Sequence, residues 1–259
     1  MKKLLLTTAA LALIAAPAVA ADLPARTYAK TPVYVPPPVY NWTGIYFGGH
    51  VGGGWADQGA TTLAPGSAAF PIGSVQAKNN LSGFLGGVQA GFNWQASNLV
   101  LGVEGEYSWA DVHGTATSAS PVLPGFTSTV TAKDKDYALA TGRLGYAADN
   151  WLFFAKGGGA WAQTSSSGTG FLASGAVFDT TTASATRSGW VVGAGVEWGF
   201  APNWSAKLEY NHMDFGNTNV SVLSSVSGNL NVSSTSTVEV VKGGVNYRFN
   251  WDSPVVAKY

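Results

Sequence analysis

The chain has 259 residues and no net charge at pH 7, and charged residues make up 11% of it, against about 25% in typical soluble proteins. Without excess positive charge there is no electrostatic reason to bind nucleic acid, and so few charges cannot cover the surface of a soluble globule. Cysteine is absent, which excludes disulfides and thiolate metal sites.

Residues 1–20, "MKKLLLTTAALALIAAPAVA", have the organisation of a secretory signal. Lys2 and Lys3 precede an apolar run from Leu4 to about Ala16, and Ala18-Val19-Ala20 provides a small-residue cleavage site. This run is shorter than the roughly 20 apolar residues that a membrane-spanning helix needs, and no later segment approaches that length. We therefore expect export through the Sec pathway and cleavage after Ala20.

Residues 21–41 are rich in Pro and Tyr and include the triplet Pro36-Pro37-Pro38. Consecutive prolines favour extended polyproline II and cannot pair as a central strand. We expect this segment to be a linker or arm, and the alternative is a peptide that docks on a partner in the envelope.

From Asn41 onward, apolar and polar residues alternate with a period of two. In "LVLGVEGEYSW", residues 99–109, Leu101 and Val103 share one face while Glu104 and Glu106 share the other. Such alternation over ten or more residues predicts a β-strand. Segments of this kind lie at 41–55, 83–94, 99–109, 136–146, 151–161, 189–200, 204–213 and 238–249.

The connections between these segments alternate between short and long. Tight turns are expected at 96–98, 147–150 and 201–203, and connections of about twenty residues near 56–77, 112–133, 163–186 and 216–234. An even number of strands connected in this way is typical of bacterial transmembrane β-barrels, whose closed sheet pairs every backbone group in lipid. The predicted fold is all-β: an eight-stranded antiparallel transmembrane β-barrel over 42–249, with short periplasmic turns and four long extracellular loops. The arm 21–41 and the tail 250–259 are then periplasmic.

The aromatic residues test this prediction independently, since they gather at the two ends of the predicted strands. Membrane barrels carry an aromatic girdle at each membrane interface. The expected girdle at the short-turn end contains Trp42, Trp94, Trp151, Trp198, Trp204 and Phe249, and that at the loop end contains Trp55, Trp109, Trp161 and Trp190.

Charged residues in the middle of the strands occupy the alternate positions, on the face opposite to the apolar, lipid-facing residues. They are Glu104, Glu106, Arg143, Lys156, Glu197, Lys207, Glu209, Lys242 and Arg248. A soluble ligand-binding barrel would have an apolar interior, so this pattern disfavours one. An eight-stranded barrel is just wide enough for side chains to fill, which favours a plug of ion pairs. A narrow water-filled conduit is the alternative.

Glu104 and Glu106 raise the question of chemistry directly. Two carboxylates in an apolar run can form an acid/base catalytic couple with separated pKa values, as in glycoside hydrolases. They can also belong to a buried ionic network. Because residues two apart in a strand point to the same side, we expect both in the lumen, with Arg143 and Lys156 as their first partners.

Other apparent motifs give no support for a catalytic or cofactor site. The match of "GGGAWA" to a dinucleotide-binding fingerprint lies within a predicted strand instead of opening a helix. His50, His113 and His212 lack metal-ligand spacing, and no G-x-S-x-G nucleophile motif occurs. We therefore expect no enzyme activity, no cofactor and no metal, and an incidental role for each histidine.

Three stretches, "NWTGIYFGGHVGGGW", "TGRLGY" and "GGVNYRF", give the chain a family resemblance. Over residues 41–249 it resembles the small outer-membrane immunogenic, porin-like proteins of Gram-negative bacteria, which are related to OmpA-type barrels. The resemblance implies that Tyr247 and Phe249 form the C-terminal signal read by the barrel-assembly machinery. The chain departs from the pattern by continuing beyond Phe249, since this signal usually ends the sequence.

The predicted function is that of a structural, surface-exposed barrel in the bacterial outer membrane, with lipid and the assembly machinery as partners. It would support envelope integrity and present its loops to the exterior, where the sequence identifies no partner. The alternative is a weak porin-like channel or a surface protein that binds a ligand such as haem or contacts a host. His113 is the one histidine in a predicted loop, which is thin support for haem.

Overall fold

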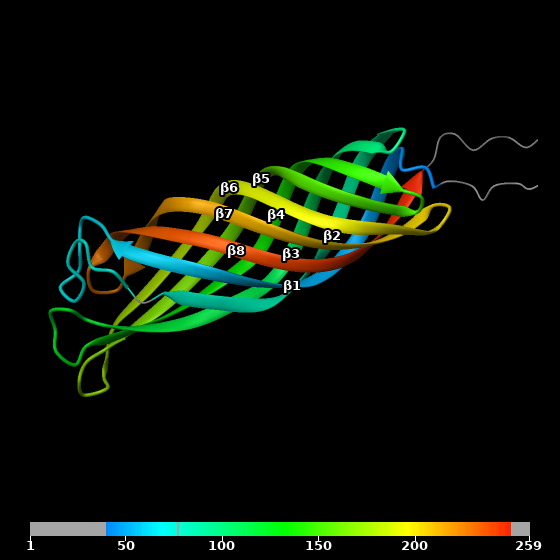
Figure 1. Ribbon diagram of the computed structural model, residues 1–259. Helices are drawn as coiled ribbons and strands as arrows, with labels where there is room; N and C mark the ends of the chain where they lie inside the picture. Colours follow the sequence, from blue (N-terminus) through cyan, green and yellow to red (C-terminus); the bar gives the residue numbers. More distant parts are fainter. Residues whose placement is uncertain (1–39, 77, 250–259) are drawn as a thin grey trace, which may run out of the picture. The chain divides into compact units, whose positions relative to one another are not determined.

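The computed structural model describes residues 40–76 and 78–249, which form a closed antiparallel barrel (Figure 1). Each strand pairs with its neighbour in sequence, and β8 closes the ring by pairing with β1. The strands are β1 (Gly44–Thr62), β2 (Asn79–Ala96), β3 (Leu99–Ala119), β4 (Thr127–Ala148), β5 (Trp151–Phe171), β6 (Val177–Ala201), β7 (Trp204–Ser224) and β8 (Gly228–Phe249). The predicted eight-stranded fold is confirmed.

Several predicted segments lie outside this description. The signal 1–20, the arm as far as residue 39 and the tail 250–259 are not among the described residues. No helix in the described part of the chain is long and apolar enough to cross a membrane.

The three tight turns are present at the end of the barrel opposite the long connections. Ser97 and Asp149 adopt positive φ angles of 56° and 52°, which reverse the chain within two residues. Asparagine side chains fasten two of these turns to neighbouring strands. Asn98 Nδ2 donates to the Ala147 carbonyl at 2.7 Å, and Asn203 Nδ2 donates to the Arg248 carbonyl at 2.7 Å.

The prediction of strands about ten residues long with four long loops is wrong in its boundaries. The strands span 18 to 25 residues and continue through most of the segments that were expected to be loops. The connections between strands at this end are therefore shorter, at 63–78, 120–126, 172–176 and 225–227. About ten tilted residues are enough to cross a bilayer, so the remaining length of each strand extends beyond it.

These extensions were missed because their outer face is polar and their inner face mixes polar with apolar residues. On the outer face, Thr115 and Thr131 form a cross-strand hydroxyl hydrogen bond of 3.0 Å, and Thr117 and Thr129 form another of 3.0 Å. Threonine has high β-propensity, and cross-strand threonine pairs stabilise antiparallel sheets. Where water replaces lipid, however, the contrast between apolar and polar faces disappears, and with it the period-two signal.

The predicted assignment of residues to the two faces holds through the middle of the barrel. The exposed outer side chains there include Phe47, Phe84 and Val103, which are 55%, 82% and 61% exposed. The predicted girdle residues on this outer face are Trp55, Trp94, Trp109, Trp151, Trp161, Trp190, Trp198, Trp204 and Phe249. Their positions fit two aromatic girdles.

Trp42 is a correction, because its side chain is buried inside the barrel and has no exposed surface. It precedes β1, whose first residue Gly44 has a φ of 138°. Inside the barrel, Trp42 packs against Tyr40, with ring centroids 4.5 Å apart. Counting back by two from the inward-facing Tyr46 assigns Trp42 to the inner face, and its aromatic type alone had suggested a girdle.

Glycines on the inner face make room for long side chains that cross the narrow lumen. A Cβ atom on Gly91 would lie 2.4 Å from Tyr46 Oη, and one on Gly52 would lie 2.7 Å from Lys242 Cβ. Neither position can hold a larger residue without displacing the tyrosine or lysine, so glycine there permits the packing of the lumen.

Candidate functional site

At membrane level, the described part of the lumen contains nine buried charged side chains, which come from six of the eight strands. We call this group the ion-pair cluster: Glu104, Glu106, Arg143, Lys156, Glu197, Lys207, Glu209, Lys242 and Arg248. Each of them is at most 5% exposed. All nine residues were assigned to the inner face from the sequence. The period-two alternation of each strand therefore identified the members of the cluster.

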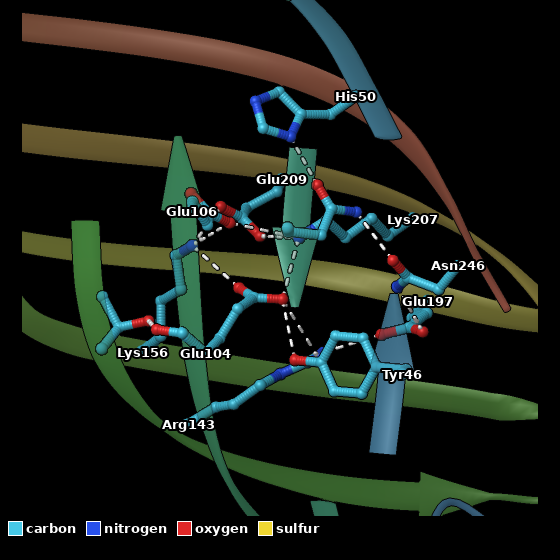
Figure 2. Close-up of polar contacts among 12 residues, drawn as sticks. Tyr46, His50, Glu104, Glu106, Arg143, Lys156, Glu197, Lys207, Glu209 and Asn246 are labelled. Carbon is cyan, nitrogen blue, oxygen red and sulfur yellow. Dashed lines mark hydrogen bonds and ion pairs between the residues drawn. The ribbon is translucent and has the colours of Figure 1, made fainter. Parts of the chain in front are cut away.

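The centre of the ion-pair cluster is a set of glutamates bridged by lysines (Figure 2). Lys156 Nζ lies 3.2, 2.9 and 2.6 Å from carboxylate oxygens of Glu104, Glu106 and Glu209. Lys207 Nζ lies 3.2, 3.3 and 3.2 Å from the same three carboxylates. Each ammonium group therefore joins glutamates of β3 and β7 across the lumen.

Lys242 of β8 completes this centre by contacting Glu106 and lying 3.4 Å from Glu209. Oxygens of Glu104, Glu106 and Glu209 lie within 4.8 Å of one another, which is close enough for a shared cation. Three lysine ammonium groups already neutralise them, so the donor set fits an ion-pair network and not a metal site.

Arg143 connects this centre to the fourth carboxylate of the cluster, that of Glu197, which lies nearer the short-turn end. Its Nη2 lies 2.8 Å from Glu197, and its Nη1 donates to Tyr46 Oη at 3.1 Å. Tyr46 Oη in turn donates to Glu104 at 2.8 Å, whereas Arg143 itself is 3.9 Å from Glu104. Of the two expected first partners, Lys156 contacts both Glu104 and Glu106 directly, and Arg143 pairs more closely with Glu197.

Arg248 occupies the short-turn end of the lumen beside aromatic rings. Its guanidinium is 3.5 Å from Glu197 and lies over Trp42 and Tyr40, 4.7 and 5.3 Å from their ring centroids. Cation–π contact with a desolvated ring is worth about 2 kcal/mol. The sequence did not predict this aromatic closure of the barrel end, because Trp42 was assigned to the outer face.

The histidines lie in different environments and do not converge. His50 is buried in the lumen, where its ring nitrogens contact Gln89 and, at 2.8 Å, Ser108 Oγ. His113 lies on the outer face of β3, 3.4 Å from Asp111. His212 lies on the outer face of β7, 2.7 Å from Glu239. The expected incidental role is therefore wrong for His50, which belongs to the polar filling of the lumen.

Above the ion-pair cluster, toward the loops, the lumen is filled by an apolar layer. Along β8, the inward residues change from Lys242 through Val240 and Val238 to Ser234. We call the corresponding ring of buried side chains the apolar layer: Ala56, Leu81, Leu85, Val112, Ala132, Tyr137, Leu139, Ala160, Ala162, Val191, Met213, Phe215, Val238 and Val240. It separates the ion-pair cluster from the loop end.

Two buried charges beyond the apolar layer, Asp134 and Arg187, were not predicted. Arg187 follows the inward alternation of β6, whereas a β-bulge between Asp134 and Asp136 shifts the alternation of β4 by one residue and turns Asp134 inward. They lie on the loop side of Trp109 and Trp190. Asp134 accepts hydrogen bonds from Thr164 at 2.8 Å, and from Tyr137 and Gln58. Burial raises the pKa of the Asp134 carboxyl and lowers the pKa of the Arg187 guanidinium.

A cavity of about 190 Å³ opens above these two residues, which we call the outer cavity. Ser, Thr and Val side chains of the strand extensions line it, and Phe70 and Phe126 contribute at the rim. Arg187 lies among the lining residues, together with Thr164 and with Ala132, which also belongs to the apolar layer. The barrel is thus filled at membrane level and hollow beyond it.

The comparisons with known proteins agree with this architecture. Residues 6–249 match the family model described as an outer membrane protein β-barrel domain. The chain is 31% identical to the 31 kDa outer-membrane immunogenic protein of Brucella melitensis, covering 96% of this chain and 100% of that protein. It is 27% identical to the 25 kDa outer-membrane immunogenic protein of Brucella abortus, with 96% and 99% covered.

Two further similarities are more distant. The 22 kDa outer membrane protein of Rhizobium leguminosarum is 28% identical, over 69% of this chain and 66% of that protein. Among solved structures, neisserial surface protein A is similar with a TM-score of 0.37 and 13% identity, over 80% of this chain and 98% of that one. Together with the closed barrel, the family match and the Brucella relatives establish that this chain belongs to the outer-membrane β-barrel family and resides in the bacterial outer membrane.

Proposed function

We propose that this protein is a structural, surface-exposed barrel that supports envelope integrity and whose lumen is closed by the ion-pair cluster and the apolar layer. The observation that carries the proposal is the set of lysine–glutamate contacts that crosses the lumen between β3, β5, β7 and β8. These strands are not all neighbours in the sheet, so the contacts brace opposite walls of the barrel.

The energetics of burial favour a plug over an open conduit. Removing an ion from water costs several kcal/mol, and this cost is offset only where each charge is paired and hydrogen-bonded. Tyr46, Ser205 and Asn246 meet much of this requirement, because they donate to Glu104 or Glu197 at 2.6 to 3.0 Å. The Arg248 guanidinium has no hydrogen-bond partner among the described residues, and its charge is offset by Glu197 and by the neighbouring aromatic rings. The apolar layer adds a second barrier, because an ion that crosses it would lose its hydration.

The outer surface supports the lipid and assembly partners that we propose for the barrel. Nine aromatic girdle residues lie on the outer face, where their rings suit the membrane interface. Tyr247 and Phe249 end β8 on this same face, with ring centroids 4.9 Å apart. We propose that the assembly machinery reads these two rings. The strand extensions carry the connecting loops beyond the membrane, and we infer no catalytic role.

A deletion strain tests this proposal in the cell. We expect loss of the gene to increase detergent sensitivity and leakage of a periplasmic marker, and the wild-type gene to restore the barrier. The double variant Glu104→Gln/Glu106→Gln should restore it less well, whereas the matched surface variant Lys133→Gln should act as wild type. A deletion strain with an intact barrier but slower uptake of small solutes would contradict the structural role and favour a pore.

A further inference from the structure

Arg187 is a buried cation with no described carboxylate in direct contact, and the opposing charge that acts on it from a greater distance is that of Asp134. It is 4% exposed, and its guanidinium donates only to Ser234, at 2.8 Å to Oγ and 3.3 Å to the carbonyl oxygen. Its Nε has no hydrogen-bond partner, and no carboxylate of the described residues forms an ion pair with it within 4.0 Å. This situation differs from that of every cation in the ion-pair cluster, each of which has a glutamate nearby.

The acidic groups around Arg187 are already engaged with neutral donors. The Asp134 carboxylate accepts from Thr164, Tyr137 and Gln58. Asp179 lines the same outer cavity, and its two oxygens accept from Ser224 Oγ and Ser225 Oγ at 2.8 Å each. Arg187 is therefore the one positively charged group among the described residues that line the cavity, and neither Asp134 nor Asp179 forms a hydrogen bond with it.

The pairing of the strands around Arg187 is incomplete. Pairing of β6 with β7 is interrupted between the Thr182–Leu223 pair and the Trp190–Asp214 pair. Within this interval β6 remains paired with β5, where Arg187 lies opposite Ala162. Arg187 thus extends from a segment of β6 that pairs with β5 alone and borders the outer cavity.

Apolar side chains share the remaining wall of the outer cavity with serine and threonine hydroxyls. Buried or half-buried aliphatic side chains from β4, β7 and β8 face it, and two phenylalanines lie near its mouth. The principal apolar residues are Phe126, Val130, Phe178, Val220, Leu230 and Val232. Sites for small amphipathic ligands usually combine apolar walls with a few polar groups that fix the orientation of the ligand. In this cavity Arg187 is the cationic group, and the carboxylate of Asp179 is held by serine hydroxyls.

We propose that the outer cavity binds a small monocarboxylate with an apolar body, whose carboxylate pairs with Arg187. An ionised carboxylate supplies a counter-charge in direct contact and an acceptor for Nε, and charge-assisted bonds of this kind are among the strongest hydrogen bonds. The apolar body displaces water from the valine and phenylalanine walls. Because the cavity lies above the apolar layer, this binding does not require an open lumen and is independent of the proposed structural role.

Calorimetric titration of the refolded full-length mature chain with hexanoate tests the proposal, with hexan-1-ol as the neutral ligand and detergent alone as blank. We expect saturable binding of hexanoate by the wild type and at least about tenfold weaker binding of hexanol, as one charge-assisted hydrogen bond implies. Arg187→Gln should bring the two affinities together. Lys133→Gln, which removes an exposed lysine of the same barrel end, should leave the preference unchanged.

A second pair of variants keeps the test decisive if Arg187→Gln fails to fold, as judged by heat-modifiable migration in gels. Ala116 lines the cavity, whereas its neighbour Thr117 points outward. Ala116→Trp should abolish hexanoate binding, and Thr117→Trp should preserve it. The proposal is overturned if the wild type shows no saturable binding, if it binds hexanol as tightly, or if Ala116→Trp binds hexanoate normally.

Discussion

The same eight strands enclose two regions with opposite contents, the ion-pair cluster at membrane level and the outer cavity beyond it. In the first, four carboxylates and five cations contact one another and fill the space. In the second, Asp134 and Arg187 each bond only to neutral groups, and a cavity remains. A narrow barrel is therefore closed where its charges pair directly, and a cavity remains where Asp134 and Arg187 bond to neutral groups instead of to each other.

Removal of two carboxylates from the ion-pair cluster should have the largest effect. Glu104→Gln/Glu106→Gln leaves Lys156, Lys207 and Lys242 with Glu209 alone, and breaking a buried pair costs about 3–5 kcal/mol. We expect the free energy of unfolding to fall by at least that much, measured by urea titration in lipid vesicles with the gel shift as readout. An unchanged urea midpoint would show that the cluster does not stabilise the barrel.

A truncation in the apolar layer should have a smaller effect. Met213 is 1% exposed and packs within this layer, and Met→Ala substitutions in cores cost about 2–5 kcal/mol. We expect the cost of Met213→Ala to fall within this range. Leu208→Ala, on the lipid-facing side of the same strand, is the matched control and should cost less in urea titration.

The pH dependence of stability should distinguish the outer region from the cluster. Burial raises the pKa of Asp134 in the fold, so between its ordinary value and the raised one the folded state holds the proton more tightly than the unfolded chain. Stability contributed by this group is thus lost as pH rises through that window. Compared with wild type, Asp134→Asn should become relatively more stable as pH rises there, and a constant difference would contradict the burial argument.

The smallest effect should come from the exposed pair formed by Lys133 and Asp111, 2.8 Å apart on the outer face. Lys133 holds the pKa of the Asp111 carboxyl below its usual range. We expect Lys133→Gln to raise that pKa toward the ordinary value, as measured by carbon NMR, with no change in the urea midpoint. A marked loss of stability would mean that surface pairs also support the extensions.

The sequence could predict the membrane-level part of the fold and most of its site, because lipid outside and polar groups inside give each strand two contrasting faces. The period-two alternation of the sequence was enough to predict that residues such as Lys207 and Glu209 point into the lumen. Their partners were not predicted, since which groups meet across the lumen depends on strand register and tilt. Lys207 contacts Glu104 at 3.2 Å although 103 residues separate them.

Beyond the membrane that contrast fails, and the predictions failed with it. The strand extensions look like loops in the sequence, so the inward phase was not followed to Asp134 and Arg187. The wrong assignment of Trp42 to the outer face has another cause. Its aromatic character was given more weight than its position in the period-two alternation. Counting in steps of two identifies Arg187 and Trp42 as inward-facing side chains. It assigns Asp134 to the outer face, because the β-bulge between Asp134 and Asp136 shifts the alternation of β4.

Planar-bilayer recording of the purified protein tests the central claim most directly, because a lumen closed by the ion-pair cluster and the apolar layer cannot carry a steady ion current. We predict no discrete conductance steps for the wild type under an applied voltage. Reproducible, ion-selective steps whose size or selectivity changes in Glu106→Gln would show that ions pass the cluster and would contradict the account.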